Sequence, residues 1–132
     1  MRALTAPLEE LGELDEIKKQ LKKKDGCVSL TGCVESQKVH MIYGLSEGCK
    51  NRLIITFSDL RVKELLEDCC FYDRNAMSYP AKDLIFYQAD IHGNQLVTER
   101  IRCLRRMLEG KPVTVVTTLS GQMCIRDRLL AD

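Results

Sequence analysis

The chain of 132 residues has no tryptophan, and none of its seven cysteines forms a C-x-x-C pair. An odd cysteine count without paired spacing or an indicated signal peptide argues against a disulfide framework. The two histidines, His40 and His92, form no H-E-x-x-H or similar set, so we expect no metal site. Cys69 and Cys70 with His92 are the one trio that could supply a catalytic thiol or metal ligands. We interpret the cysteines as buried or incidental reduced thiols.

The chain also has neither a surplus of one charge nor a long apolar run. Lys and Arg number 20 and Asp and Glu 19, which gives a formal net charge of +1. No global attraction to nucleic acid or to a membrane surface follows from that balance. The apolar runs are far shorter than the roughly 20 residues that span a bilayer. We therefore expect a cytoplasmic protein with no membrane partner, long enough for one domain with its own core.

Residues 1–26 predict an N-terminal amphipathic helix. Acidic residues come early and lysines late, as the helix dipole favours, and Pro7 suits a first turn. Gly26 is expected to end the helix. We interpret the lysine run 22–24 as a solvated helix end rather than a nucleic-acid patch. The apolar stripe consists of Leu8, Leu11, Leu14, Ile17 and Leu21.

From residue 27 onward, short apolar runs alternate with helical patterns. This order predicts an α/β fold, a doubly wound parallel sheet of about four strands with helices on both faces. The nearly continuous apolar run Leu53–Phe57 predicts a strand buried on both faces. The predicted strands are Cys27–Thr31, Leu53–Phe57, Ala76–Tyr79 and Val113–Thr117, and Pro80 should end the third.

Three helices are expected between these strands. The first covers Ser36–Gly48, with Val39, Ile42 and Tyr43 on one face. Ser58 can cap the second, whose inward residues Val62, Leu65, Leu66 and Cys69 follow the i, i+3, i+4, i+7 spacing. The third follows Gly93-Asn94, ends at Gly110 and should turn inward its residues Val97, Ile101, Leu104 and Leu108.

The first crossover, Val28–Lys38, lies where many nucleotide-binding proteins have a phosphate loop. In the frame of G-x-x-x-x-G-K-[ST], this chain has Ser29, Val34 and Glu35, and only Ser36 matches. A carboxylate about 4 Å from a phosphate charge is repelled by about 4 kcal/mol at an effective dielectric near 20. We therefore expect a degenerate loop that binds no nucleotide. An ordinary crossover unrelated to nucleotide binding is the alternative.

Four arginines crowd the third helix and could bind phosphates, but interleaved apolar residues favour a solvated face. These arginines are Arg100, Arg102, Arg105 and Arg106. The irregular stretch through Asp83 carries Leu84, Phe86 and Tyr87, which could line a ligand cleft or cover the sheet. We expect them to cover the sheet.

The last residues, 121–132, have neither helical nor strand periodicity. The run Gln122–Arg128 matches an in-frame translation of the transposon-end adapter used to build sequencing libraries. We expect a non-native tail, the natural protein being cut off near Ser120, and deletion of residues 122–132 should leave the melting temperature nearly unchanged. A genuine polar tail is the alternative.

Several segments together resemble the N-terminal domain of bacterial transcription-repair coupling factors (Mfd), which is homologous to the helicase-like component of the excision nuclease. The resemblance covers about ninety residues, although Lys82-Asp83 and Ile85-Phe86 depart from the family's Trp-Glu and Leu-Pro. Its segments are the degenerate loop Leu30–Ser36, the strand Leu53–Phe57, the run Tyr79–Tyr87 (like W-E-x-L-P-Y), Thr98–Ile101 (like S-E-R-L) and the strand Val113–Leu119.

The resemblance implies a helicase-like (RecA-like) domain at residues 27–120, incomplete and with a degenerate phosphate loop. It implies a non-catalytic scaffold portion of an ATP-driven DNA translocase that removes stalled RNA polymerase and recruits nucleotide excision repair. The parent would use ATP and magnesium and would bind RNA polymerase, the damage-recognition ATPase and double-stranded DNA. This portion would carry no motor motif, catalytic residue or cofactor, and it would contact the parent's other domains.

Two alternatives come from other classes of protein. Ser29–Glu35 also resembles the flavodoxin phosphate loop T-x-T-G-x-T-E, which implies an FMN-binding domain. However, Val34 replaces a hydroxyl donor, a long charged helix precedes the loop, and no tryptophan can stack on a flavin. A stand-alone α/β adaptor is the second alternative.

Overall fold

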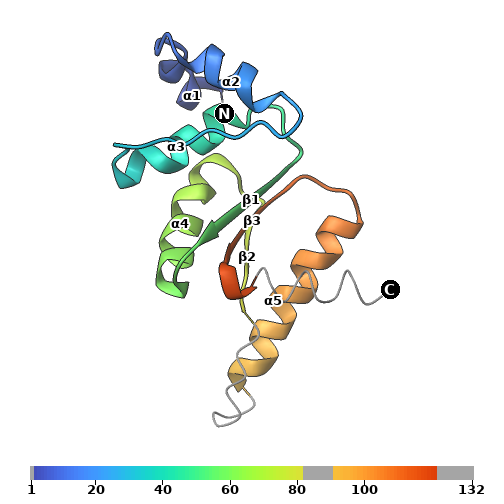
Figure 1. Ribbon diagram of the computed structural model, residues 1–132. Coiled ribbons are helices and arrows are strands. Elements are labelled where there is room, and N and C mark those ends of the chain that lie inside the picture. The colour runs from blue at the N-terminus through green and yellow to red at the C-terminus, as the bar shows by residue number, and fades with distance from the viewer. Residues whose placement is uncertain (1, 82–90, 122–132) are drawn as a thin grey trace. The chain divides into compact units, whose positions relative to one another are not determined.

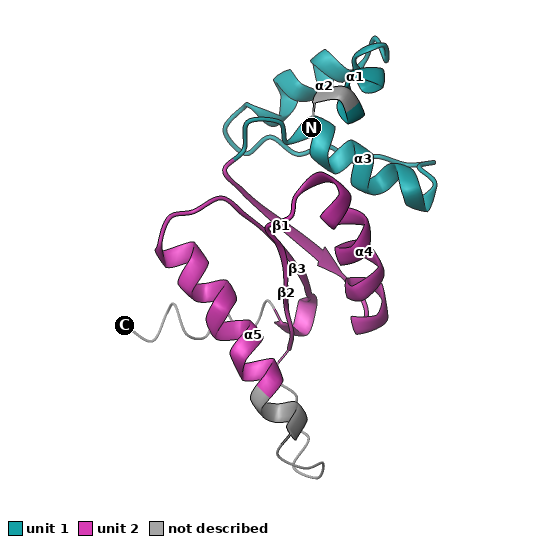
Figure 2. Cartoon of the chain, turned by 180° about the vertical axis from the view of Figure 1, so that it is seen from behind, with its two compact units in different colours: residues 1–49 teal, residues 50–132 magenta. Residues whose placement is uncertain are grey.

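The computed structural model describes residues 2–81 and 91–121 and forms two compact units, residues 1–49 and 50–132 (Figures 1 and 2). The sequence predicts a domain boundary after residue 26, whereas the boundary between the two units lies between Cys49 and Lys50. The difference arises because the helix after residue 34 packs with the helices that precede it in the chain.

The first unit is a small cluster of three helices: α1 (Arg2–Glu9), α2 (Leu14–Leu21) and α3 (Glu35–Leu45). Leu8 packs against Gly44 of α3, where an added Cβ would lie 2.4 Å from the Leu8 Cδ1 atom. Glycine at this position therefore allows the close approach of α1 and α3. The buried apolar residues of the unit are Leu8, Leu14, Val39 and Tyr43.

The prediction of one N-terminal helix is wrong, because two turns separate α1 from α2. The Leu11 amide donates to the Leu8 carbonyl (3.1 Å), and the Leu14 amide donates to the Leu11 carbonyl (2.9 Å). Gly12 lies between them and has a low helix propensity. Pro7 lies inside α1 rather than before a long helix, so it removes a backbone donor from this short helix.

Gly26 helps to end the N-terminal helical segment by its size. An added Cβ on Gly26 would lie 2.2 Å from the Gln20 carbonyl oxygen, so only glycine fits there. The left-handed backbone conformation belongs to its neighbour Asp25, with φ of 62°. The chain then runs without regular secondary structure to α3, so the predicted strand Cys27–Thr31 is not confirmed.

The described residues of the second unit contain a parallel sheet of three strands: β1 (Asn51–Thr56), β2 (Ala76–Tyr79) and β3 (Val113–Thr118). The strand order β1-β3-β2 makes the last strand the central one. These three strands confirm the predicted parallel α/β sheet in its coarse form. Every residue of β3 is buried, as expected for a strand with neighbours on both sides and helices on both faces.

Helices α4 (Asp59–Tyr72) and α5 (Ile91–Leu108) lie on opposite sides of the sheet in both views (Figures 1 and 2). The connection from β1 to β2 and the connection from β2 to β3 cross the sheet in opposite directions. If both connections are right-handed, as is usual, their helices lie on opposite faces of the sheet. The predicted cap of α4 is confirmed, since the Ser58 hydroxyl accepts from the Arg61 amide at 3.2 Å. Of the four residues predicted to face inward, Val62, Leu65 and Cys69 are buried and Leu66 is half-buried.

The prediction that β1 is buried on both faces is wrong. Ile54 is buried, but Leu53 is 51% exposed and Ile55 is 44% exposed. Among the described residues, β1 pairs only with β3 and is therefore an edge strand. Its apolar sequence is typical of a central strand, although β1 has a neighbour on one side only among the described strands.

The inward face predicted for α5 is wrong for three of its four residues, since only Leu104 is partly buried and packs against the core. Val97 is 53% exposed and Leu108 is 88% exposed, whereas Cys103 is completely buried. Cys103 packs in a core cluster with Tyr79, Val113 and Val115. The helix begins at Ile91 and is rotated by about one residue relative to the expected stripe, which is about 100°.

Hydrogen bonds satisfy the buried threonines of β3. The Thr114 hydroxyl donates to Asp73 Oδ2 (2.9 Å), and the Thr117 hydroxyl donates to the Tyr79 carbonyl (2.7 Å). The Thr118 hydroxyl accepts from the Gly121 amide at 3.2 Å. These bonds connect the central strand to the end of α4, to β2 and to its own exit.

Candidate functional site

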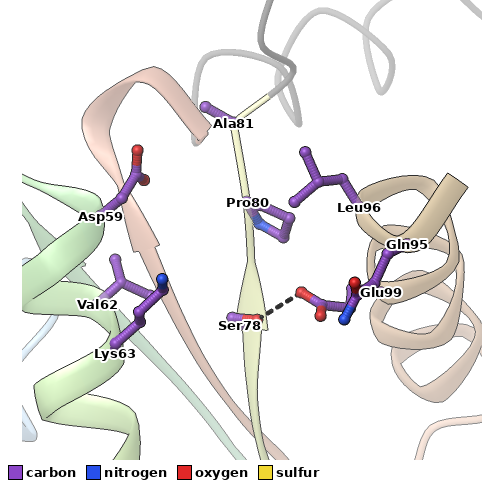
Figure 3. Close-up of a pocket in the computed structure, with 9 residues that line it drawn as sticks. All are labelled: Asp59, Val62, Lys63, Ser78, Pro80, Ala81, Gln95, Leu96 and Glu99. Atoms are coloured by element: carbon purple, nitrogen blue, oxygen red, sulfur yellow. Dashed lines mark hydrogen bonds between the residues drawn. The ribbon is translucent and has the colours of Figure 1, made fainter. Parts of the chain in front are cut away.

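A cavity of about 400 Å³ lies at the carboxyl end of β2, between α4 and α5 (Figure 3). Ligands of open α/β sheets bind outside the carboxyl ends of the strands, so this is the place where a site is expected. The lining residues are Asp59, Val62, Lys63, Ser78, Pro80, Ala81, Gln95, Leu96 and Glu99.

Charged groups of both signs line the cavity. Asp59 and Lys63 lie one turn apart on the same side of α4, directly after the Ser58 cap. On the other side, Glu99 of α5 accepts a hydrogen bond from the Ser78 hydroxyl at 3.1 Å (Figure 3). The described lining residues offer polar and ionic contacts from two carboxylates, one lysine and one hydroxyl.

Arg100 fastens α5 to the end of β2 beside this cavity. Its Nη1 atom donates to the Pro80 carbonyl at 2.9 Å. Its guanidinium carbon lies 4.6 Å from the centroid of the Tyr79 ring, within the range of a cation–π contact. Glu99 and Arg100 therefore both bind the β2 segment, one through Ser78 and the other through Tyr79 and Pro80.

The expectation that the four arginines form a solvated face is half wrong. Arg100 and Arg106 are turned toward the rest of the unit, and Arg106 hydrogen-bonds the Pro112 carbonyl (3.2 Å) and the Asn75 side chain. Arg102 and Arg105 are exposed. The four guanidinium groups thus do not gather on one surface that could follow a phosphate backbone.

One exposed arginine belongs to a local ionic cluster at the end of α5. Glu109 accepts from Lys111 Nζ at 2.7 Å and from Arg105 Nε at 2.9 Å. The hydrogen bonds from Lys111 and Arg105 lower the pKa of the Glu109 carboxyl, and the bond from Lys111 has the larger effect. Arg105 therefore already has a carboxylate partner.

The degenerate phosphate loop lies in the first unit and does not follow a strand. Gly32 has a φ of 79°, and α3 begins at Glu35 after the exposed residue Val34. The Glu35 carboxylate pairs with Lys38, one turn later in the helix. The strand–loop–helix geometry in which backbone amides surround a phosphate is thus not present at this loop.

The cysteine trio considered from the sequence does not form a described cluster. Cys69 is buried against the sheet, whereas its neighbour Cys70 is exposed, and the side chain of His92 lies outside the described part. Cys103 is buried, and burial raises the pKa of its thiol. In residues 2–81 and 91–121, no group of three or more His, Cys, Asp or Glu side chains could hold a metal ion.

Two other expectations lie outside the described residues, namely the aromatic stretch with Leu84, Phe86 and Tyr87 and the tail from Gln122. Within the described helices, none is long and apolar enough to cross a bilayer.

Comparison with models of known protein families, with curated proteins and with solved structures finds no match. Asp59, Lys63 and Ser78 belong to no motif that indicated a site, and Glu99 was noted only within the segment Thr98–Ile101. A signal existed, because Ser58 and Pro80 mark the carboxyl ends of two parallel strands and such ends lie at one edge of a sheet.

Proposed function

We propose that this chain is a non-catalytic scaffold portion of a transcription-repair coupling factor. The parent protein would be an ATP-dependent DNA translocase that removes stalled RNA polymerase and recruits nucleotide excision repair. The helicase-like, RecA-like character of the domain belongs to this proposal, as do the parent's partners, ATP and magnesium.

One observation supports the proposal most directly. Two segments that carry the resemblance, Tyr79-Pro80 and Glu99-Arg100, are separated by about twenty residues and contact each other. The Arg100 guanidinium makes both a hydrogen bond to the Pro80 carbonyl and a cation–π contact with the Tyr79 ring. These two interactions position α5 on the sheet. Residues that stabilise the fold are shared by proteins of the same architecture. A resemblance carried by such residues therefore favours a common architecture rather than a common catalytic activity.

The degenerate loop also supports a role without nucleotide chemistry. Val34 and Glu35 stand where a glycine and a cation are needed, and Glu35 pairs with Lys38.

The parent can be tested by recovering the native reading frame beyond the codon for Ser120. The proposal predicts an open frame that continues into an intact Walker A motif and helicase motifs. An early stop codon, or a continuation without motor motifs, would contradict the coupling-factor assignment and favour a stand-alone adaptor.

A further inference from the structure

Every described residue that lines the cavity at the carboxyl end of β2 belongs to the second unit. Two hydrogen bonds fix one wall, because Glu99 of α5 accepts from the Ser78 hydroxyl and Arg100 donates to the Pro80 carbonyl. The other wall is the beginning of α4, which packs on β2 and β3 and buries Val62. The geometry of these two walls is therefore determined within one unit.

Opposite charges lie on opposite sides of this cavity. Lys63 belongs to α4 and Glu99 to α5, and the end of β2 lies between the two helices (Figure 3). Among the described residues, Lys63 takes part in no ion pair. The Ser78 hydroxyl donates one hydrogen bond to Glu99 Oε2, whereas a carboxylate can accept about four. Both charged groups therefore have hydrogen-bonding capacity left for a ligand.

Apolar side chains make up much of the remaining lining. They come from both helices and from the end of β2, and they are Val62, Pro80, Ala81 and Leu96. A ligand in this cavity thus meets an apolar surface next to one cationic group and the carboxylates of Asp59 and Glu99. Small-molecule sites commonly combine an apolar lining with a few polar groups that fix the orientation of the ligand.

The charges restrict the class of ligand that fits. A ligand that covers Lys63 must supply an anionic group, and one that covers Glu99 must supply a donor, because burying an unpaired charge costs free energy. A phosphate ester would place additional negative charge near Asp59 and Glu99, and an aliphatic diamine would place a second ammonium group near Lys63. A molecule with one carboxylate and one ammonium group avoids both repulsions.

We propose that this cavity binds a free amino acid with an aliphatic side chain. The α-carboxylate accepts from Lys63, the α-ammonium group donates to Glu99, and the aliphatic side chain packs against Pro80 and Leu96. The cavity of about 400 Å³ lies at the small end of the range of about 300–1,000 Å³ for ligand pockets, which suits a small ligand. Binding at this site is independent of the coupling-factor assignment, because it uses only these side chains of the second unit.

The test is calorimetric titration of the full chain with L-leucine and L-isoleucine, with a reducing agent present. Two analogues of leucine each lack one charge: leucinamide has no carboxylate, and 4-methylpentanoate has no ammonium group. We expect at least one of the two amino acids to bind with a dissociation constant below about 1 mM. Each analogue should bind at least about tenfold more weakly than leucine, because it loses one charged hydrogen bond. No saturable binding of either amino acid up to about 10 mM overturns the proposal, and so does an analogue that binds as tightly as leucine.

Two substitutions place the ligand in the cavity. Lys63→Gln and Glu99→Gln should each weaken the binding of the amino acid at least about tenfold. Lys63→Gln should also reduce the preference for leucine over leucinamide, and Glu99→Gln the preference for leucine over 4-methylpentanoate, because each variant lacks the partner of the group that the analogue lacks. Lys24→Gln and Glu67→Gln are the matched controls, since both residues are exposed and lie outside the lining, and they should leave binding unchanged.

Unchanged binding in both cavity variants would overturn the proposal, because the amino acid would then bind elsewhere. Equal weakening in the two control variants would also overturn it. Glu99 contributes to the fold through its hydrogen bond with Ser78, so circular dichroism of each variant checks that the helices remain folded. Lys63 is exposed, and the titration of Lys63→Gln decides the question if Glu99→Gln does not fold.

Discussion

Replacing Thr114 by valine removes one hydroxyl from the centre of the sheet at almost constant volume. Thr114 is completely buried and donates to Asp73 Oδ2 at 2.9 Å, while Asp73 Oδ1 accepts from the Asn75 amide at 2.8 Å. A hydrogen bond to a charged group contributes about 1.5–3 kcal/mol to stability, and Asp73, which is only 8% exposed, would lose one of its acceptor contacts. We expect a loss of about 2 kcal/mol, which lowers the melting temperature by about 8–16 °C.

The assay is thermal and urea unfolding followed by circular dichroism, with a reducing agent present. Thr56→Val is the control, because Thr56 lies in the same sheet and makes no side-chain hydrogen bond within the described part of the chain. It should change stability by less than about 0.5 kcal/mol. Equal, small effects of the two substitutions would refute the reasoning. A double-mutant cycle with Asp73→Asn should show coupling of about 1 kcal/mol or more.

Three further predictions concern α5 and the exit of β3. Arg100→Met should lower the free energy of unfolding by about 1–3 kcal/mol, because it removes the hydrogen bond to the Pro80 carbonyl and the contact with the Tyr79 ring. Arg105→Met removes only an exposed ion pair and should have a clearly smaller effect in the same urea titration. Gly121→Ala should lower the melting temperature, because the added Cβ would lie 2.3 Å from the Thr117 hydroxyl oxygen. Gly12→Ala is the control and should leave the melting temperature unchanged, since nothing lies within 4 Å of its added Cβ. Equal melting temperatures of the two variants would contradict this prediction. Because burial raises the pKa of Cys103, its neutral thiol stabilises the fold below about pH 9, and this stability is lost as the pH rises through the raised value. Cys103→Ala should therefore lose stability less steeply with alkaline pH, and an unchanged slope would contradict the assignment.

Local signals in the sequence were sufficient for α4 and the three strands of the second unit. Ser58 supplies the hydroxyl that caps the helix, and Val62, Leu65 and Cys69 follow at helical spacing, so element type and inward face are both determined locally. Pro80 and Gly110 mark the ends of β2 and α5 in the same way, since neither residue continues the element before it.

The face of α5 could not be predicted, because two overlapping stripes compete for it. Val97, Ile101 and Leu108 form the more apolar stripe, yet they are exposed. The buried stripe contains Cys103 and Arg100, whose partners Tyr79 and Pro80 are distant in sequence. The contacts of the buried stripe are therefore made only in the folded chain, where a local sequence pattern cannot show them.

The order of the strands and the identity of the edge strands could not be predicted from the sequence for a related reason. The apolar run of β1 predicts a strand, but its burial depends on which strands lie beside it. Cys27–Thr31 has a comparable local pattern and forms no strand, because the first unit consists of helices and offers it no partner. The cavity beside β2 was missed because its residues come from three elements whose proximity depends on the same pairing.

Calorimetric titration of the full chain with magnesium and ATP tests whether the chain is a scaffold that binds no nucleotide. We expect no saturable heat at micromolar to millimolar ATP, because the loop lacks both glycines and the lysine that hold phosphates. Restoring the lysine alone, with Glu35→Lys, should not create binding, since no strand precedes the loop to form the phosphate cradle. A dissociation constant in the micromolar range, weakened by Ser36→Ala, would contradict the account.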